Sequence, residues 1–145
     1  MTGGPWLFDV DGTVVDGITG RSLRPFAREL LGALRERGIP VLLWSSGGAE
    51  YAWRRARETG IDGLVVAAYT KQARDRAGRW SLPTALVANP PSVLVDDLPA
   101  EVPEVGEVIG VSAYIGPNPR DSALEVLLRR VRAVSTTEGH ERADQ

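Results

Sequence analysis

Short apolar runs alternate with longer amphipathic segments along most of the chain. Five runs are apolar enough to form buried strands, at residues 5–10, 39–44, 61–69, 92–97 and 106–116. Three segments repeat apolar residues at helical spacing, at residues 23–38, 47–60 and 120–134. Apolar strands that alternate with amphipathic helices are typical of a doubly wound α/β fold. We therefore expect a Rossmann-like, three-layer domain with a parallel sheet of about five strands.

The remaining segments have weaker patterns. Residues 13–22 place two glycines between alternating apolar positions, which predicts a small hairpin or flap. Residues 71–80 and 81–91 predict short helices or turns. The chain becomes polar after its last helical segment, so we expect a single domain over residues 1–134 and a frayed tail over residues 135–145.

Composition narrows the chemistry that the chain can perform. The net charge of −2 argues against non-specific binding of nucleic acid, because no excess of cations faces the phosphates. No cysteine is present, and the single histidine, His140, lies in the polar tail. Thiolate metal sites, multi-histidine sites and a Ser-His-Asp triad within one chain are thereby excluded, and any metal must be held by oxygens. Such a donor set favours a hard cation such as Mg²⁺.

Targeting signals are also missing from the sequence pattern. No run approaches the length of a membrane-spanning helix, and the N-terminus lacks a basic region followed by an apolar stretch. We expect a soluble, cytoplasmic protein with no membrane partner.

Polar residues follow the predicted strands at the end where a doubly wound sheet binds its ligands. They are Asp9 and Asp11, Ser45 and Ser46, Lys71, and Asp96 and Asp97. Residues two apart in a strand point to the same side, so the first two acids can face one ligand. Each pair taken alone also fits an ordinary turn, but paired carboxylates need a cation beside them. Together the four acids predict a magnesium site built from oxygen ligands.

The remaining polar residues suit an anion. Ser45 and Ser46 precede a predicted helix whose first N–H groups are unpaired, which favours a phosphate, although the pattern taken alone is better explained by an ordinary helix cap. Lys71 is the only lysine among 17 basic residues. A lysine supplies a compact point charge, whereas an ordinary surface position is the alternative interpretation.

These motifs, in this order, resemble the haloacid dehalogenase superfamily, and specifically its phosphatases, over residues 5–134. The sequence DVDGT at Asp9 resembles the first motif, and Ser45 resembles the second. Lys71 resembles the third motif, although many relatives carry that lysine just before the fourth strand. Asp96 and Asp97 resemble the acidic fourth motif.

The resemblance implies a Mg²⁺-dependent phosphatase that acts through an aspartyl-phosphate. It implies that Asp9 attacks phosphorus, and that Asp11 protonates the leaving oxygen, then activates water, and binds Mg²⁺ through its backbone carbonyl. Ser45 and Lys71 would hold the phosphoryl oxygens, and Asp96 and Asp97 would ligate the metal directly or through water.

Two features of the chain limit the substrate and the alternatives. The connections around the flap and after Gly47 are short, so we expect no large cap domain and an open site, suited to a large phosphorylated substrate or shielded in a homo-oligomer. A signalling receiver domain is an alternative, but Thr70 and Lys71 stand where its phospho-accepting aspartate would follow the third strand. A non-catalytic binding protein of the same fold is the other alternative, and the intact Asp11 argues against it.

Overall fold

A computed structural model describes residues 3–143, with side chains described as far as residue 134. The frayed tail expected for residues 135–145 therefore falls outside the described side chains and stays a prediction.

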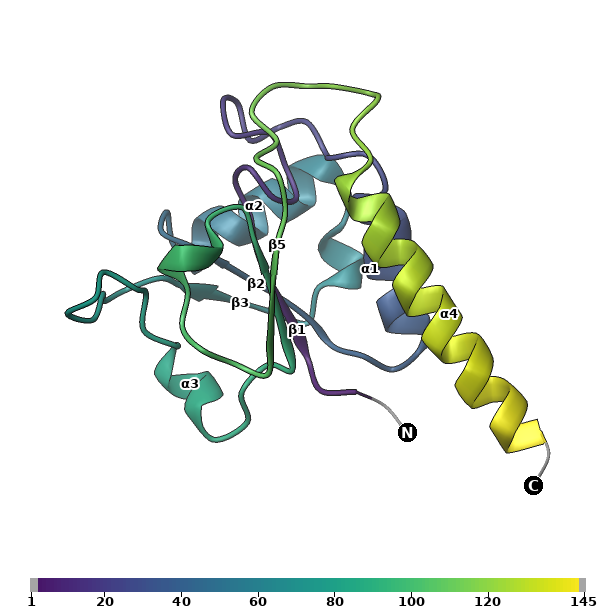
Figure 1. Cartoon of the computed structure of the whole chain (residues 1–145). Helices are drawn as coiled ribbons and strands as arrows, with labels where there is room; N and C mark the ends of the chain where they lie inside the picture. Colours follow the sequence, from purple (N-terminus) through teal and green to yellow (C-terminus); the bar gives the residue numbers. More distant parts are fainter. Residues whose placement is uncertain (1–2, 144–145) are drawn as a thin grey trace.

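Five parallel strands form one sheet, which confirms the doubly wound α/β fold expected from the apolar runs (Figure 1). The strands are β1 (Trp6–Asp9), β2 (Val41–Ser45), β3 (Ala67–Thr70), β4 (Val93–Asp96) and β5 (Glu107–Gly110). Their order is β3-β2-β1-β4-β5, with every neighbouring pair parallel. The strand order thus reverses between β1 and β4, and the carboxyl ends of these two strands frame the position where such sheets bind ligands.

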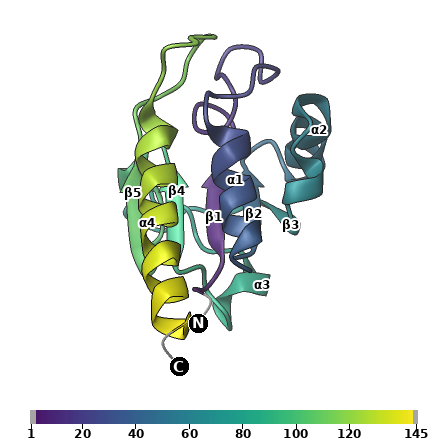
Figure 2. The same ribbon diagram turned by 90° about the vertical axis from the view of Figure 1, so that its right-hand side faces the viewer.

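Three helices cover one face of the sheet. They are α1 (Ala27–Glu36), α2 (Ala49–Thr59) and α4 (Ala123–Ala143), and α4 packs alongside α1 (Figure 2). Alternate strand residues point toward them, including Phe8, Leu43 and Val95, which are at most 1% exposed. These strand side chains and the apolar faces of the helices form the larger hydrophobic core.

The opposite face is covered by the connections from β3 to β4 and from β4 to β5. These carry only the short helix α3 (Thr84–Val87) and the 3₁₀ turn η2 (Pro99–Glu101). A second, smaller core forms there from the other set of strand side chains, among them Leu7, Trp44 and Leu94. Leu86 and Val102 pack against this set, so the fold has three layers of unequal thickness.

Two apolar runs are longer than the strands that they contain. The expected strand at 61–69 begins only at Ala67, because the chain first forms the 3₁₀ turn η1 (Asp62–Leu64). The expected strand at 106–116 ends at Gly110. The chain then leaves the sheet to run along the flap, where the N–H of Tyr114 donates to the carbonyl of Gly12.

The predicted flap is present as a compact loop closed by an antiparallel bridge between Val15 and Leu23. Asp16 lies fully buried within it and accepts hydrogen bonds from the N–H groups of Thr19 and Ser22. These hydrogen bonds outweigh the effect of burial and lower the pKa of Asp16 to about 2. The flap is therefore held by an ionised carboxylate at neutral pH.

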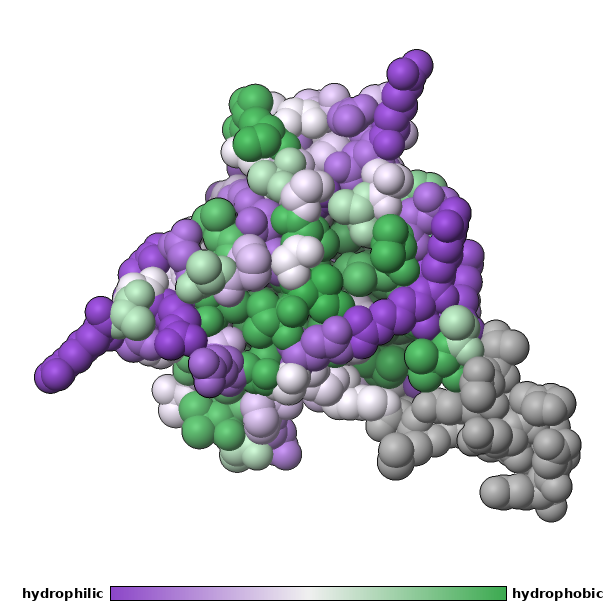
Figure 3. Space-filling view, viewed as in Figure 1, coloured by the Kyte–Doolittle hydropathy of each residue, from purple (hydrophilic) through white to green (hydrophobic). Residues whose placement is uncertain are grey.

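Within residues 3–143 neither the flap nor the connection after β2 carries an inserted domain, as expected for a form without a large cap. Among these residues no helix combines the length and apolarity needed to cross a bilayer. Figure 3 shows apolar residues spread over the face that displays the edge strand β5.

Candidate active site

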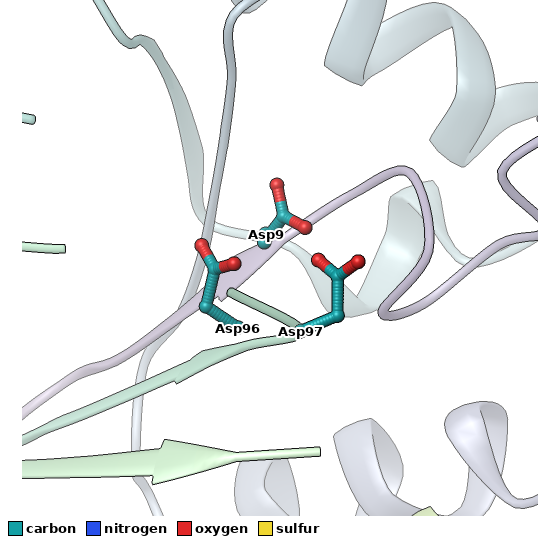
Figure 4. A group of neighbouring side chains, drawn as sticks. All are labelled: Asp9, Asp96 and Asp97. Carbon is teal, nitrogen blue, oxygen red and sulfur yellow. The ribbon is translucent and has the colours of Figure 1, made fainter. Parts of the chain in front are cut away.

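Three carboxylates meet where the strand order reverses. Asp9 ends β1, Asp96 ends β4 and Asp97 follows it, and one oxygen of each lies within 4.8 Å of the others (Figure 4). Asp9 is 7% exposed and Asp96 is 1% exposed. Buried carboxylates this close repel one another unless a cation compensates them. The oxygen-only donor set fits a hard divalent cation.

Lys71 lies in the same cluster, although it follows β3 rather than preceding β4. Its backbone N–H donates to the carbonyl of Ser45, which fixes the start of the side chain. Its Nζ lies 2.9 Å from Oδ1 of Asp9 and 3.2 Å from Oδ2 of Asp96. The ammonium also sits over the ring of Trp44, 5.0 Å from its centroid. The single lysine of the chain is therefore a buried counter-charge and not a surface residue.

One lysine does not neutralise the cluster. Burial and the repulsion of Asp96 raise the pKa of Asp9 from 3.8 to about 8, against the opposing attraction of Lys71. Burial also raises the pKa of Asp96. For Lys71, burial lowers the pKa, but the two carboxylates outweigh it and raise the pKa overall. The site thus has an excess of negative charge that favours a further cation.

Thr13 connects the loop after β1 with the loop after β4. Its hydroxyl lies 2.9 Å from Oδ2 of Asp9 and 3.3 Å from Oδ1 of Asp97, and it accepts the N–H of Asp97 at 3.1 Å. The preceding Gly12 has φ of +82°, and a Cβ there would lie only 2.7 Å from an oxygen of Asp97. Glycine is therefore required at this point of the DVDGT loop.

The carboxylate of Asp11 does not belong to the group formed by Asp9, Asp96 and Asp97. It turns instead toward the first turn of α2, where Tyr51 donates its hydroxyl to both carboxylate oxygens, at 2.7 and 2.8 Å. The side chain of Asp11 is half-buried, so one side of it remains open to solvent or to a ligand.

The two serines after β2 differ in their surroundings. Ser45 is 3% exposed, and its Oγ accepts the N–H of Gly47 at 3.0 Å. No acceptor for its hydroxyl proton lies within the described part of the chain, so that proton is available to an anion. Ser46 is exposed, and its predicted contact with phosphate stays a prediction. At the start of α2, the N–H of Ala49 donates to Oγ1 of Thr70.

A buried arginine holds the loops of the site together. Arg24 is 1% exposed and forms a two-pronged ion pair with Asp121, at 2.8 and 3.0 Å. Its remaining N–H groups donate to the carbonyls of Gly12, Thr13 and Ser112. One side chain thereby joins the DVDGT loop, the loop after β5 and the start of α4.

Sequence reasoning gave no role to Tyr51, Arg24 or the hydroxyl of Thr13. Thr13 could have been found, because it stands inside the DVDGT motif. Tyr51 had a weaker signal, namely a polar aromatic residue in the first turn of a helix that begins at the carboxyl edge of the sheet. Arg24 had none, because one arginine among many looks the same whether it is buried or exposed.

Comparison with known proteins assigns the chain to no family. No model of a known protein family matches the chain, and no curated protein matches it.

Proposed function

We propose that the protein is a Mg²⁺-dependent phosphatase of the haloacid dehalogenase type, acting on a phosphomonoester through an aspartyl-phosphate at Asp9. The observation that supports this proposal most directly is the position of Lys71. Its ammonium bridges Asp9 and Asp96 while Asp97 lies beside them. A buried nucleophilic carboxylate beside a fixed ammonium and two further acids suits phosphoryl transfer better than it suits a structural ion pair.

Electrostatics explains why the cations are needed. A carboxylate and a phosphate oxygen, each with unit charge, repel by about 4 kcal/mol at 4 Å and an effective dielectric constant near 20. A phosphate dianion presents two such charges to Asp9, so attack requires compensation. Lys71 supplies one positive charge, and Mg²⁺ held by Asp9, Asp96 and Asp97 would supply the rest and orient the phosphoryl group.

The side chains of this chain divide the remaining work. One oxygen of Asp9 bonds to phosphorus as the bond from phosphorus to the ester oxygen breaks, and Asp11 gives its proton to that oxygen. Water then attacks the phosphorus of the aspartyl-phosphate as the bond from phosphorus to the carboxylate oxygen of Asp9 breaks, which releases inorganic phosphate and restores the Asp9 carboxylate, and a proton of the water returns to Asp11. Ser45 donates its free hydroxyl proton to a phosphoryl oxygen.

Turnover of p-nitrophenyl phosphate tests the proposal. We expect hydrolysis that requires Mg²⁺, stops with a chelator, and is lost in Asp9→Asn and strongly reduced in Asp11→Asn. Asp62→Asn is the matched control, because Asp62 lies in η1, before β3, and is exposed. Reduction of the trapped acyl phosphate with borohydride, followed by peptide mass spectrometry, would locate the intermediate at residue 9. Robust turnover by Asp9→Asn would refute the assignment of the nucleophile.

The same experiment separates the two alternatives. A phosphoryl-accepting signalling domain would accumulate a long-lived adduct at Asp9 without sustained release of phosphate. A binding protein would show neither an adduct nor Mg²⁺-dependent hydrolysis across a panel of phosphorylated metabolites.

A further inference from the structure

Among the described side chains, the carboxylate of Asp11 has one hydrogen-bond partner, which contacts both of its oxygens. The hydroxyl of Tyr51 lies 2.7 Å from Oδ1 and 2.8 Å from Oδ2, so its single proton is shared between them. Among the side chains of residues 3–134, no other one donates to this carboxylate. Both distances are ordinary for O–H···O hydrogen bonds. The orientation of Asp11 therefore depends on Tyr51.

Tyr51 is in turn fixed by its neighbours. Arg55 lies one turn further along α2 and stacks on the ring of Tyr51, with its guanidinium carbon 4.8 Å from the ring centroid, and Arg54 lies 5.6 Å away. The flap approaches the same hydroxyl so closely at Gly20 that a Cβ there would lie 3.1 Å from the tyrosine oxygen. The same Cβ would lie 2.7 Å from Nε of Arg55. The hydroxyl is thus enclosed between α2 and the flap.

The tyrosine remains a hydrogen-bond donor over the range in which an enzyme works. Burial and the proximity of Asp11 raise the pKa of Tyr51, and Arg55 only partly opposes this rise. Tyr51 therefore keeps its proton at neutral pH and donates it to Asp11.

We propose that Tyr51 is the positioning residue that aims the carboxyl group of Asp11 at the leaving-group oxygen of the substrate. This role rests on the proposed phosphatase function. When Asp11 is protonated, the proton occupies one carboxyl oxygen, and Tyr51 hydrogen-bonds to the other. Tyr51 thereby fixes the plane of the carboxyl group and leaves the other oxygen to carry the proton. Tethering of this kind removes rotational freedom that would otherwise be lost in the transition state.

The proposal predicts a dependence on the leaving group. An aryl oxygen such as p-nitrophenolate departs readily without a proton, whereas an alkyl oxygen must be protonated as it leaves. The value of kcat/KM covers the steps up to the departure of the leaving group. A misdirected Asp11 should therefore lower kcat/KM for an alkyl ester much more than for an activated aryl ester.

The experiment compares Tyr51→Phe with wild type on benzyl phosphate and on p-nitrophenyl phosphate, both with saturating Mg²⁺. We expect kcat/KM to fall about 10- to 100-fold for benzyl phosphate, within the range that general acid catalysis contributes, and less than about threefold for p-nitrophenyl phosphate. Tyr69→Phe is the matched control, because Tyr69 lies in β3 and its hydroxyl makes no hydrogen bond within the described residues.

A second variant shows whether Tyr51 acts through Asp11. In an Asp11→Asn background, Tyr51→Phe should cause no further loss of kcat/KM on benzyl phosphate. If the two residues acted independently, the effects of the two substitutions would multiply. If the wild type is active and Tyr51→Phe lowers kcat/KM equally for both esters, or for neither, the role of Tyr51 is overturned and the phosphatase proposal stays intact. A wild type that hydrolyses neither ester overturns the proposed function itself.

Discussion

Replacing Asp9 with asparagine should stabilise the metal-free protein, even though it should abolish turnover. Asp9 is 7% exposed and faces Asp96, and burial together with this repulsion raises its pKa from 3.8 to about 8. Asparagine keeps the shape and the hydrogen-bond acceptor but removes the charge. Lys71 retains Asp96 as a partner in the variant.

The sign and size of the effect follow from linkage. The unfolded chain releases the proton of Asp9 near pH 3.8, whereas the folded protein holds it up to about pH 8. The folded state therefore binds more protons between these values, and its stability falls as the pH rises through this window. Each pH unit costs about 1.36 kcal/mol, so Asp9 removes about 4 kcal/mol of stability between pH 5 and pH 8. Asp9→Asn carries no such dependence.

Urea unfolding in the presence of a chelator, at pH 5 and at pH 8, measures this difference. We expect Asp9→Asn to be more stable than wild type at both values, with a margin that grows by up to about 4 kcal/mol at the higher pH. Asp62→Asn, at an exposed position, should follow the wild-type curve. An Asp9→Asn protein no more stable than wild type at pH 8 would refute the electrostatic account of the cluster.

Two further substitutions test the buried ion pairs. Lys71→Ala removes the ammonium that lies 3.2 Å from Asp96. We expect the free energy of unfolding, measured in urea at neutral pH, to fall by about 3 kcal/mol and turnover to be lost. A variant as stable as wild type would contradict the assigned contact. Asp121→Asn leaves the guanidinium of Arg24 buried without its partner charge, so we expect a loss of about 3–5 kcal/mol by the same measurement, and a change within about 0.5 kcal/mol would show that this pair does not hold the loops together.

The sheet could be predicted because buried parallel strands consist of continuous runs of apolar residues. The limits of the strands could not, because an apolar residue serves a strand, a turn or a loop equally well when it is buried. Ile61 and Val65 are buried but belong to the connection that packs beneath α2, so the run at 61–69 overstates β3. Likewise, the run at 106–116 continues past Gly110 because Tyr114, which pairs with the flap, is also buried.

The site divides in the same way. Asp9, Lys71 and Asp96 could be predicted to meet because the carboxyl ends of parallel strands lie along one edge of the sheet, whichever chain segments they belong to. Tyr51 and Arg24 reach the site through tertiary packing, by way of a helix turn and the segment after the flap. Their positions depend on distances that no spacing along the chain encodes.

Lys71 compensates only part of the negative charge of the cluster. Its ammonium already touches both Asp9 and Asp96, yet the pKa values of both acids remain raised. The uncompensated charge is thus a property of the whole group, which includes Asp97. A cation that binds there must displace the proton that Asp9 holds, so its binding strengthens as the pH rises. Repulsion among the three carboxylates destabilises the metal-free fold at pH 8, and a cation bound there would relieve this repulsion. On the proposed function, the same three carboxylates therefore determine both the stability of the metal-free protein and its affinity for the cation.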